Sequence, residues 1–278
     1  MHIRFWGTRG SIPTPGPTTV RYGGNTACVE VRDSTGVLLV LDAGTGLREL
    51  GIYLMGNNHA ARPFSVDLLL SHLHWDHIQG IPFFRPAYLP NSTLRIVGPV
   101  QHSKTMKELI GLGMDDAFFP VDIDDLPAQI EMEEMSDGDE KTIGPYKVRT
   151  ASIFHPAPAL AYRIEADGRT VVYATDTEDP FSGKPNPVIP LAQGADTLIH
   201  DAQFLKSDFK ATWGHSTIDA AIDVAAQAKV KRLVLYHHDP DRNDDALDHI
   251  GRDAQRAGRE RLSGLDVVVA REGLELEV

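Results

Sequence analysis

Short runs of apolar and β-branched residues recur along almost the whole chain, and they limit the folds open to it. Many are bounded by Gly, Pro, Asn or Asp, as β-strands usually are. We predict ten strands, over residues 27–31, 37–41, 66–70, 93–97, 147–151, 160–165, 170–174, 197–200, 232–236 and 266–270. Because these runs lie in both halves of the chain and helical signals lie between them, the sequence predicts a mixed α/β fold.

The helical signals are of two kinds, a cap followed by a run and a longer stretch of helix-forming residues. Ser216 precedes a run that ends near Lys229, with Asp219 at the third helical position, so we expect Ser216 to cap a helix. Further helices are expected over 46–55, 103–111 and 244–261. Asp167-Gly168 predicts a hairpin turn, and the acidic stretch 131–140 a solvated loop. No low-complexity linker interrupts the pattern, so residues 1–278 are expected to form one domain.

Composition limits the kinds of partner that the protein is expected to bind. The apolar fraction of 42% allows a sizeable core in 278 residues. The net charge of −12 repels a phosphate backbone at long range, so long nucleic acid is not an expected partner. A small phosphorylated substrate remains possible, because bound cations would make a pocket locally positive.

The cysteine content and the apolar runs bear on the compartment. A single cysteine, Cys28, excludes an intrachain disulfide and fits a reducing cytosol. It lies in an apolar run, which favours a buried structural thiol over a nucleophile. The N-terminus lacks the apolar region of a signal peptide, and no run approaches the length of a membrane span. We therefore expect a cytoplasmic protein with no membrane partner.

Four metal-binding side chains lie within six residues, directly after the predicted strand 66–70. They are His72, His74, Asp76 and His77. In an extended segment residues two apart point the same way, so His72 and His74 can bind one cation, while Asp76 and His77 can address a second as the chain turns. Imidazole and carboxylate ligands suit Zn²⁺, Fe or Mn²⁺. The alternative is a polar surface loop that is merely rich in histidine.

This motif, His-X-His-X-Asp-His after a strand, resembles the metal-binding motif of the metallo-β-lactamase superfamily. Segments further along the chain resemble that family in the same order: the turn around Asp42, then His155, Asp176 and His237. The resemblance implies a four-layer αβ/βα sandwich and two divalent metal ions, with zinc favoured and manganese or iron as alternatives. It also implies the following ligands: His72, His74 and His155 for one ion, Asp76, His77 and His237 for the other, and Asp176 together with a water or hydroxide as the bridge between them.

His238 competes with its neighbour His237 for the last ligand position. Side chains alternate along a strand, so only one of the two should face the metals. In the family the ligand comes directly after the strand, which favours His237.

Two further segments resemble the ribonuclease Z type of phosphodiesterase. Trp213-Gly214-His215-Ser216-Thr217 is similar to a Gly-His-Ser-Thr element, and Leu198-Ile199-His200-Asp201-Ala202 to a His-Glu-Ala segment in which Asp201 replaces the usual Glu. The resemblance implies that Asp201 orients His215, which assists departure of an alkoxide. The alternative is that His215 merely precedes the cap of a helix.

Ribonuclease Z enzymes carry a long tRNA-binding arm between the third histidine and the bridging aspartate. Here only residues 156–175 separate His155 from Asp176, and a predicted hairpin fills them. The chain therefore resembles the compact phosphodiesterases without an arm, which act on small cyclic or activated phosphodiesters. In the implied reaction the bridging hydroxide attacks phosphorus, Asp76 accepts a proton, and His215 stabilises the leaving oxygen.

Two other activities are possible, and the role of two aromatic segments is undecided between several alternatives. A lactone, thioester or β-lactam hydrolase would use the same hydroxide on a carbonyl carbon, although the Gly-His-Ser-Thr element disfavours it. A di-iron redox or sensing module usually needs an electron-carrying domain, and none is visible in the sequence. The aromatic segments 81–88 and 114–119 can wall a substrate pocket, or belong to the core or to the surface of a homodimer.

Overall fold

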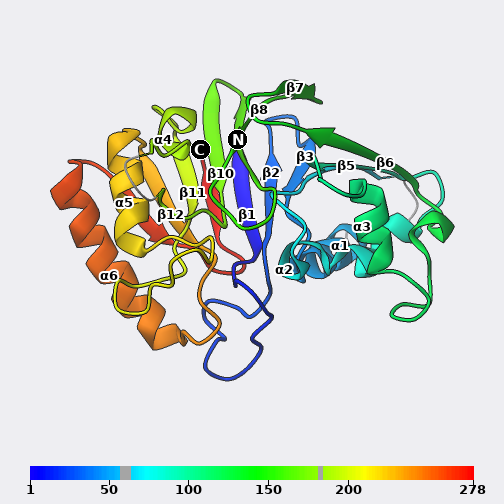
Figure 1. Cartoon of the computed structure of the whole chain (residues 1–278), viewed down its shortest axis with the longest axis horizontal. Helices are drawn as coiled ribbons and strands as arrows, with labels where there is room; N and C mark the ends of the chain where they lie inside the picture. Colours follow the sequence, from blue (N-terminus) through cyan, green and yellow to red (C-terminus); the bar gives the residue numbers. More distant parts are fainter. Residues whose placement is uncertain (57–63, 181–183) are drawn as a thin grey trace.

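The computed structural model of the chain describes residues 1–56, 64–180 and 184–278. Two seven-stranded sheets lie face to face, with helices on their outer sides (Figure 1). The first sheet has the order β14-β1-β2-β3-β4-β5-β6, and the second has the order β13-β12-β11-β10-β9-β8-β7.

The first sheet consists of β1 (His2–Gly7), β2 (Cys28–Arg32), β3 (Leu38–Leu41), β4 (Ser65–Leu69), β5 (Thr93–Pro99), β6 (Gln129–Met135) and β14 (Glu275–Glu277). The second consists of β7 (Glu140–Ile143), β8 (Tyr146–Ser152), β9 (Leu160–Ala166), β10 (Arg169–Ala174), β11 (Thr197–Asp201), β12 (Arg232–Tyr236) and β13 (Asp266–Val269). The helices are α1 (Gly46–Gly56), α2 (Trp75–Ile78), α3 (Met106–Leu112), α4 (Val188–Leu191), α5 (Ile218–Gln227) and α6 (Asp244–Arg261). Short 3₁₀ turns cover Ile81–Phe83, Arg85–Tyr88 and Ile123–Asp125.

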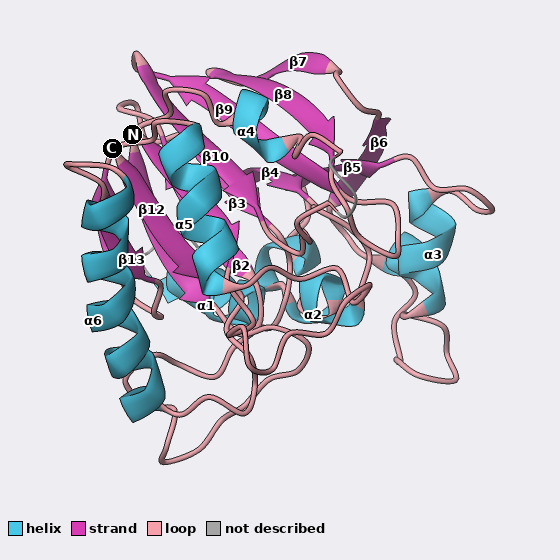
Figure 2. Cartoon of the chain, turned by 60° about the vertical axis from the view of Figure 1, so that its left-hand side comes forward, coloured by secondary structure: helices cyan, strands magenta, loops and turns pink. Residues whose placement is uncertain are grey.

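Among the described residues, three hydrophobic cores hold these layers together. The middle core lies between the sheets and includes Phe5 and Leu41 from the first, and Tyr173 and Tyr236 from the second. A second core packs α4, α5 and α6 against the outer face of the second sheet, where Figure 2 shows α5 and α6 in front of the strands. A third packs α1 and α3 against the first sheet. The predicted four-layer α/β sandwich is therefore confirmed.

Strand direction determines where functional side chains can gather. Strands β3 to β6 run parallel to one another, and so do β10 to β13. Parallel strands have their carboxyl ends at the same end of the sheet. The segments that follow β3 and β4, and those that follow β10, β11 and β12, are therefore close neighbours there. Every sequence-predicted site residue except His155 lies in or after one of these strands.

Each predicted strand is present, with bounds that differ by at most two residues. The hairpin turn is also confirmed, since Asp167 and Gly168 both have positive φ, at 54° and 68°. The predicted solvated loop over 131–140 is right only for the exposed turn at 136–139 and wrong for residues 131–135, which belong to β6. Its acidic side chains can lie in a strand because this is the edge of the sheet, where they reach solvent and Glu133 pairs with Lys141.

Two predicted helix starts also need correction. Helix α5 is capped by Thr217 rather than Ser216, since the Thr217 hydroxyl accepts the N–H of Ala220 at 3.1 Å. The Ser216 hydroxyl instead donates to the Thr177 carbonyl at 2.5 Å. Helix α3 begins later than expected, because a capping box between Thr105 and Glu108 fixes its first turn. Within the described ranges, no helix is both long enough and apolar enough to cross a membrane.

Candidate metal centre

A buried carboxylate organises the loop that follows β4. Asp42 comes directly after β3 with a φ of 59°, and its side chain is fully buried. It accepts the backbone N–H of Ser71 at 2.6 Å and the hydroxyl of Tyr173 at 2.7 Å. Its Oδ2 also lies 2.8 Å from Nδ1 of His77. In this contact His77 carries a hydrogen on Nδ1 and donates it to Asp42. The lone pair of the ring is then on Nε2 and points away from the loop.

Three histidines form a first cluster. The rings of His72, His74 and His155 lie 4.5 to 4.7 Å apart between centroids. The Nε2 atoms of His72 and His155 are buried and have no hydrogen-bond partner within the described residues. Burial lowers the pKa of His155 to about 4 and the pKa of His72 well below its ordinary value. Neutral imidazoles with unused buried lone pairs are the form in which histidine binds a cation.

A second cluster joins Asp76 and His77 to residues from the second sheet. The Nε2 of His237 lies 3.2 Å from Oδ2 of Asp76 and 3.2 Å from Nε2 of His77. His77 Nε2 is itself 3.2 Å from that same carboxylate oxygen. Together with Asp176, each of these residues offers one ligand atom within 4.8 Å of the others.

Asp176 faces both clusters. Its Oδ1 lies 3.1 Å from His237 Nε2 and 3.3 Å from His77 Nε2, whereas its Oδ2 lies 3.6 Å from His72 Nε2. Burial opposes ionisation of this carboxyl, but the surrounding histidines outweigh burial and hold its pKa well below the ordinary value. A carboxylate with one oxygen toward each cluster has the position that a bridging ligand requires.

The donor set fits divalent metal ions. The seven side chains predicted as ligands all lie in the two clusters, and their atoms are imidazole nitrogens and carboxylate oxygens. Zn²⁺, Mn²⁺ and Fe all accept this combination. The buried, unpartnered nitrogens of His72 and His155 are otherwise costly, which is a second reason to expect a cation there.

The structure separates His237 from His238. His237 has a φ of 59°, which turns it out of line with β12 and into the second cluster, where Oε1 of Gln203 lies 3.0 Å from its Nδ1. His238 faces the other way, with Nε2 at 2.8 Å from the carbonyl oxygen of Ala270. Only His237 is placed among the candidate ligands.

His215 and Asp201 form a hydrogen-bonded pair beside the second cluster. The Nδ1 of His215 lies 2.8 Å from Asp201 Oδ2, and its ring stacks on the ring of His237 at 5.0 Å and 19°. Burial lowers the pKa of His215, but Asp201 outweighs burial and raises it to about 9. The other oxygen of Asp201 accepts the N–H groups of Ser216 and Gln203, so the shorter aspartate is held in place from two sides.

The sequence interpretation missed a segment that touches the second cluster from the N-terminal side. The N–H of Ser11 donates to Asp76 Oδ2 at 2.7 Å. Gly10 lies so close to His237 that a Cβ there would be 2.4 Å from the ring, so only glycine fits. Gln203, the partner of His237 described above, was missed as well. A glycine beside a polar residue just after β1 was the only signal for this segment.

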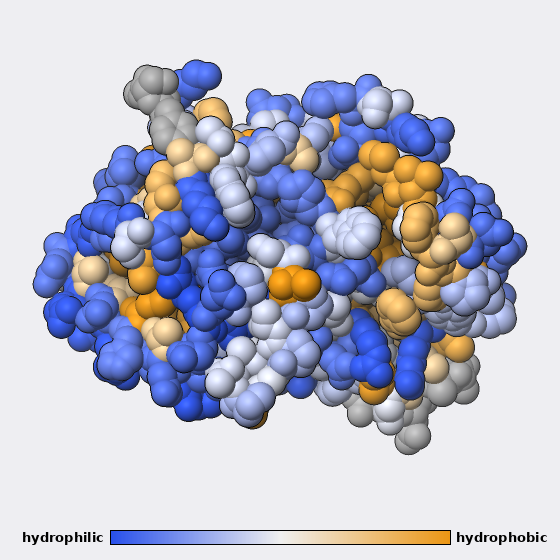
Figure 3. Space-filling model, turned by 60° about the horizontal axis from the view of Figure 1, so that its bottom comes forward, coloured by the Kyte–Doolittle hydropathy of each residue, from blue (hydrophilic) through white to orange (hydrophobic). Residues whose placement is uncertain are grey.

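Apolar side chains gather most on one side of the face that carries the loops after the strands. Figure 3 shows them in orange toward the side of α1 and α3, on a mainly hydrophilic surface. Of the two aromatic segments, Phe84 is buried in the third core, whereas Phe83 is exposed and contacts Phe119 at 5.4 Å between centroids. The segments therefore supply both core and surface.

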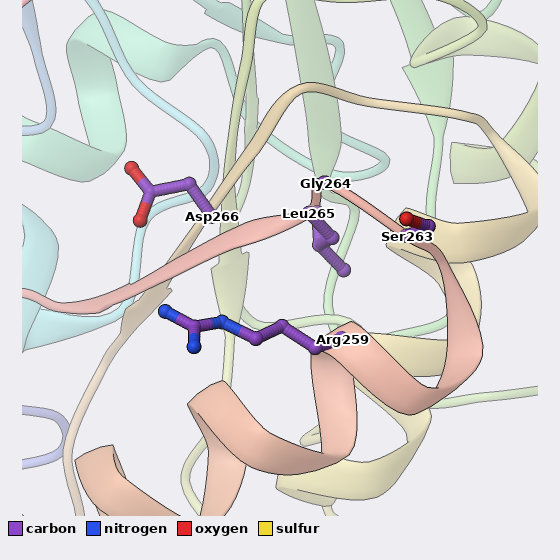
Figure 4. Close-up of a pocket in the computed structure, with 5 residues that line it drawn as sticks. All are labelled: Arg259, Ser263, Gly264, Leu265 and Asp266. Atoms are coloured by element: carbon purple, nitrogen blue, oxygen red, sulfur yellow. The ribbon is translucent and has the colours of Figure 1, made fainter.

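A separate hollow lies at the turn between α6 and β13 (Figure 4). Arg259, Ser263, Gly264, Leu265 and Asp266 line it. Asp266 pairs with Arg232 at the start of β12, whereas His237 follows the end of that strand. The hollow therefore lies at the opposite end of these strands from the candidate metal centre.

Comparisons with known proteins agree with this geometry. Residues 38–238 match the family model described as the beta-lactamase superfamily domain. The ribonuclease Z of Thermoplasma acidophilum is 26% identical, and the match covers 96% of this chain and 95% of that protein.

Solved structures share the fold. The metallo-beta-lactamase fold protein YhfI from Bacillus subtilis has a TM-score of 0.73 at 22% identity, covering 100% of this chain and 99% of that one. A diphosphatase from the PhnP family has a TM-score of 0.70 at 19% identity, covering 100% and 97%. The match of residues 38–238 to the family model shows that the chain belongs to the beta-lactamase superfamily, and it is a metal-dependent hydrolase similar to ribonuclease Z.

Proposed function

We propose that this protein hydrolyses small cyclic or activated phosphodiesters with the help of two divalent metal ions, zinc being favoured over manganese and iron. His72, His74 and His155 would hold one ion, Asp76, His77 and His237 the other, and Asp176 both. We also propose that residues 1–278 act as one domain in the cytosol, since the middle core joins both sheets and the single cysteine is buried.

The chemistry divides between the ions and the chain. Bound divalent ions would act as Lewis acids on the phosphate oxygens and lower the pKa of a water molecule. We assign to Asp76 the role of accepting the proton of that water, and the Ser11 N–H orients its carboxylate within the second cluster. His215 can donate a proton to the leaving oxygen, with Asp201 fixing the hydrogen on Nδ1 and the orientation of the ring.

The observation that carries the proposal is the His215–Asp201 pair stacked on His237. An alkoxide leaves a phosphodiester only if it is protonated or otherwise stabilised, so an oriented imidazole beside the metal cluster serves that reaction directly. The similarity to a protein named ribonuclease Z and to a diphosphatase supports phosphorus as the attacked atom.

Long nucleic acid is not part of the proposal, although one relative is named ribonuclease Z. Between His155 and Asp176 the chain forms only β9 and β10, joined by a two-residue turn at Asp167 and Gly168. This hairpin leaves no segment there that extends toward an RNA, and the net charge of −12 opposes one. Accurate cleavage of precursor tRNA at rates comparable to those for a small diester would contradict this part.

A substrate panel tests the reaction class. Purified protein would be assayed on bis(p-nitrophenyl) phosphate, a cyclic nucleotide, a lactone and a β-lactam, with and without added Zn²⁺ or Mn²⁺. We expect metal-dependent hydrolysis of the phosphodiesters and little of the carbonyl substrates. Efficient lactone or β-lactam hydrolysis without diesterase activity would assign the chain to the carbonyl hydrolases instead. An iron content with a visible absorption band would favour the di-iron redox or sensing alternative.

A further inference from the structure

The residues directly after Asp176 hold the segment that presents His215. The Thr177 carbonyl accepts the hydroxyl of Ser216 at 2.5 Å. The N–H of Glu178 donates to the Phe154 carbonyl at 2.9 Å, next to His155. The chain after β10 is therefore tied to both the His155 turn and the approach to α5.

The Glu178 carboxylate makes the closest link. Its side chain is buried, with an exposed fraction of 4% for the residue. Oε1 accepts the N–H of Thr212 at 2.9 Å, and Oε2 accepts the N–H of Gly214 at 3.0 Å. A buried carboxylate that uses both oxygens on backbone N–H groups fixes that backbone through charge-assisted hydrogen bonds.

The backbone that Glu178 binds is in an uncommon conformation. Thr212 has a φ of 68° and Gly214 a φ of 84°. The left-handed region is unfavourable for a β-branched residue such as threonine, so the turn needs support from its surroundings. The two backbone N–H groups that donate to Glu178 flank Trp213, and these hydrogen bonds supply that support.

The same turn brings His215 to the metal centre. A Cβ on Gly214 would lie 2.4 Å from Cδ2 of His155, so the turn is in close contact with the first cluster. One residue later, His215 stacks on His237 of the second cluster. The placement of the His215 ring therefore depends on a short segment whose backbone is fixed by Glu178.

We propose that Glu178 is a positioning residue for His215. Its carboxylate holds Thr212 and Gly214 so that the imidazole meets Asp201 and the leaving oxygen of the substrate. This inference rests on the proposed phosphodiesterase function, because its effect is read through the leaving-group role of His215.

The test is Glu178→Gln, which keeps the size of the side chain but replaces one acceptor by an NH₂ group that faces a backbone N–H. Loss of such a partner of a functional group costs roughly 10- to 100-fold. We expect kcat on a diester with an alkoxide leaving group to fall by about tenfold or more on that scale, with KM and metal content as in the wild type. On bis(p-nitrophenyl) phosphate the loss should be under about threefold, because p-nitrophenolate leaves without a proton.

A second readout follows the backbone itself. Hydrogen exchange of the peptide that contains residues 212–217 should be faster in Glu178→Gln than in the wild type. The matched control is Asp196→Asn, since Asp196 also accepts a backbone N–H, that of Thr170, but at the start of β11. That control should leave the ratio of the two diester rates unchanged.

Several outcomes would overturn the inference. An equal loss on both diesters, a loss of bound metal, or unchanged kinetics in Glu178→Gln would each do so. If that variant does not fold, Glu178→Asp keeps the charge with a shorter reach, and it must show the same dependence on the leaving group. The His215→Ala variant distinguishes failure of this inference from failure of the leaving-group role on which it rests. If its rates on the two diesters do not depend on the leaving group, the proposed leaving-group role of His215 and the inference fail together, whereas if they do and those of Glu178→Gln do not, only the inference fails.

Discussion

The two halves of the candidate metal centre are built in different ways. Four of its side chains come from one loop and helix, residues 72–77, next to a single strand end. The others, at 155, 176 and 237, follow three different strands of the second sheet, and His215 precedes α5. The first half is a local motif that a spacing reveals, whereas the second exists only because the fold brings distant strand ends together.

The supports of the two halves differ in the same way. Asp42 is the main support of the first, through Ser71, Tyr173 and His77, and Ser11 adds one contact to Asp76. The second is fixed by several residues with one or two contacts each, among them Gln203 on His237 and Asp201 on His215. We therefore expect changes in the second half to have graded and separable effects.

Asp176→Ala should have the largest effect, because Asp176 is where the two halves meet. We expect activity below about one-hundredth of the wild type, beyond the cost of losing an outer partner of a ligand, with reduced metal content. The control is His238→Ala, since His238 is also buried but faces Ala270. That variant should keep its metal and lose about 1 to 3 kcal/mol of unfolding free energy. If His238→Ala loses metal and His237→Ala does not, the assignment of this pair is wrong.

Loss of a ligand from one cluster should leave the metal ion of the other cluster bound. Elemental analysis of the metal-saturated protein should approach about two equivalents per chain, because seven candidate ligands exceed the four of one tetrahedral zinc. His74→Ala changes only the first cluster, so it should lower the content to about one equivalent. A firm value of one in the wild type would sink the dinuclear proposal.

The same contrast explains how much the sequence could predict. The ten predicted strands and the set of candidate ligands were found because apolar periodicity and the 72–77 spacing are local signals. Gly10, Ser11 and Gln203 were missed because their roles depend on contacts across more than thirty residues of chain, which no spacing records. The acidic strand β6 was missed because its charged residues were interpreted as a solvated loop. A strand at the edge of a sheet can carry charged side chains, since they reach solvent there.

His215→Ala should affect one substrate type more than another. His215 is not among the seven predicted ligands, so we expect both clusters to keep their metals. We expect kcat to fall about a hundredfold or more on a diester with an alkoxide leaving group, which is the usual scale of general acid help, and less on a p-nitrophenyl diester. Asp201→Asn should show the same trend more weakly, because it only orients the ring. Equal losses on both substrates would leave phosphate binding as the better account of His215.

The smallest expected effect is that of Gln203→Leu, which tests whether the second half is supported piece by piece. Leucine has a similar size but cannot accept the Nδ1 hydrogen of His237, so the ring loses its orientation without leaving the cluster. We expect metal affinity about tenfold weaker, measured by competition with a chelator, and near-normal kcat once the metal is saturating. Asp42→Asn is the comparison from the first half. It removes a charged acceptor on which Ser71, Tyr173 and His77 all depend, so it should lower unfolding stability by about 3 kcal/mol as well as metal affinity. A loss of stability in Gln203→Leu as large as that in Asp42→Asn would mean that the two halves are supported alike.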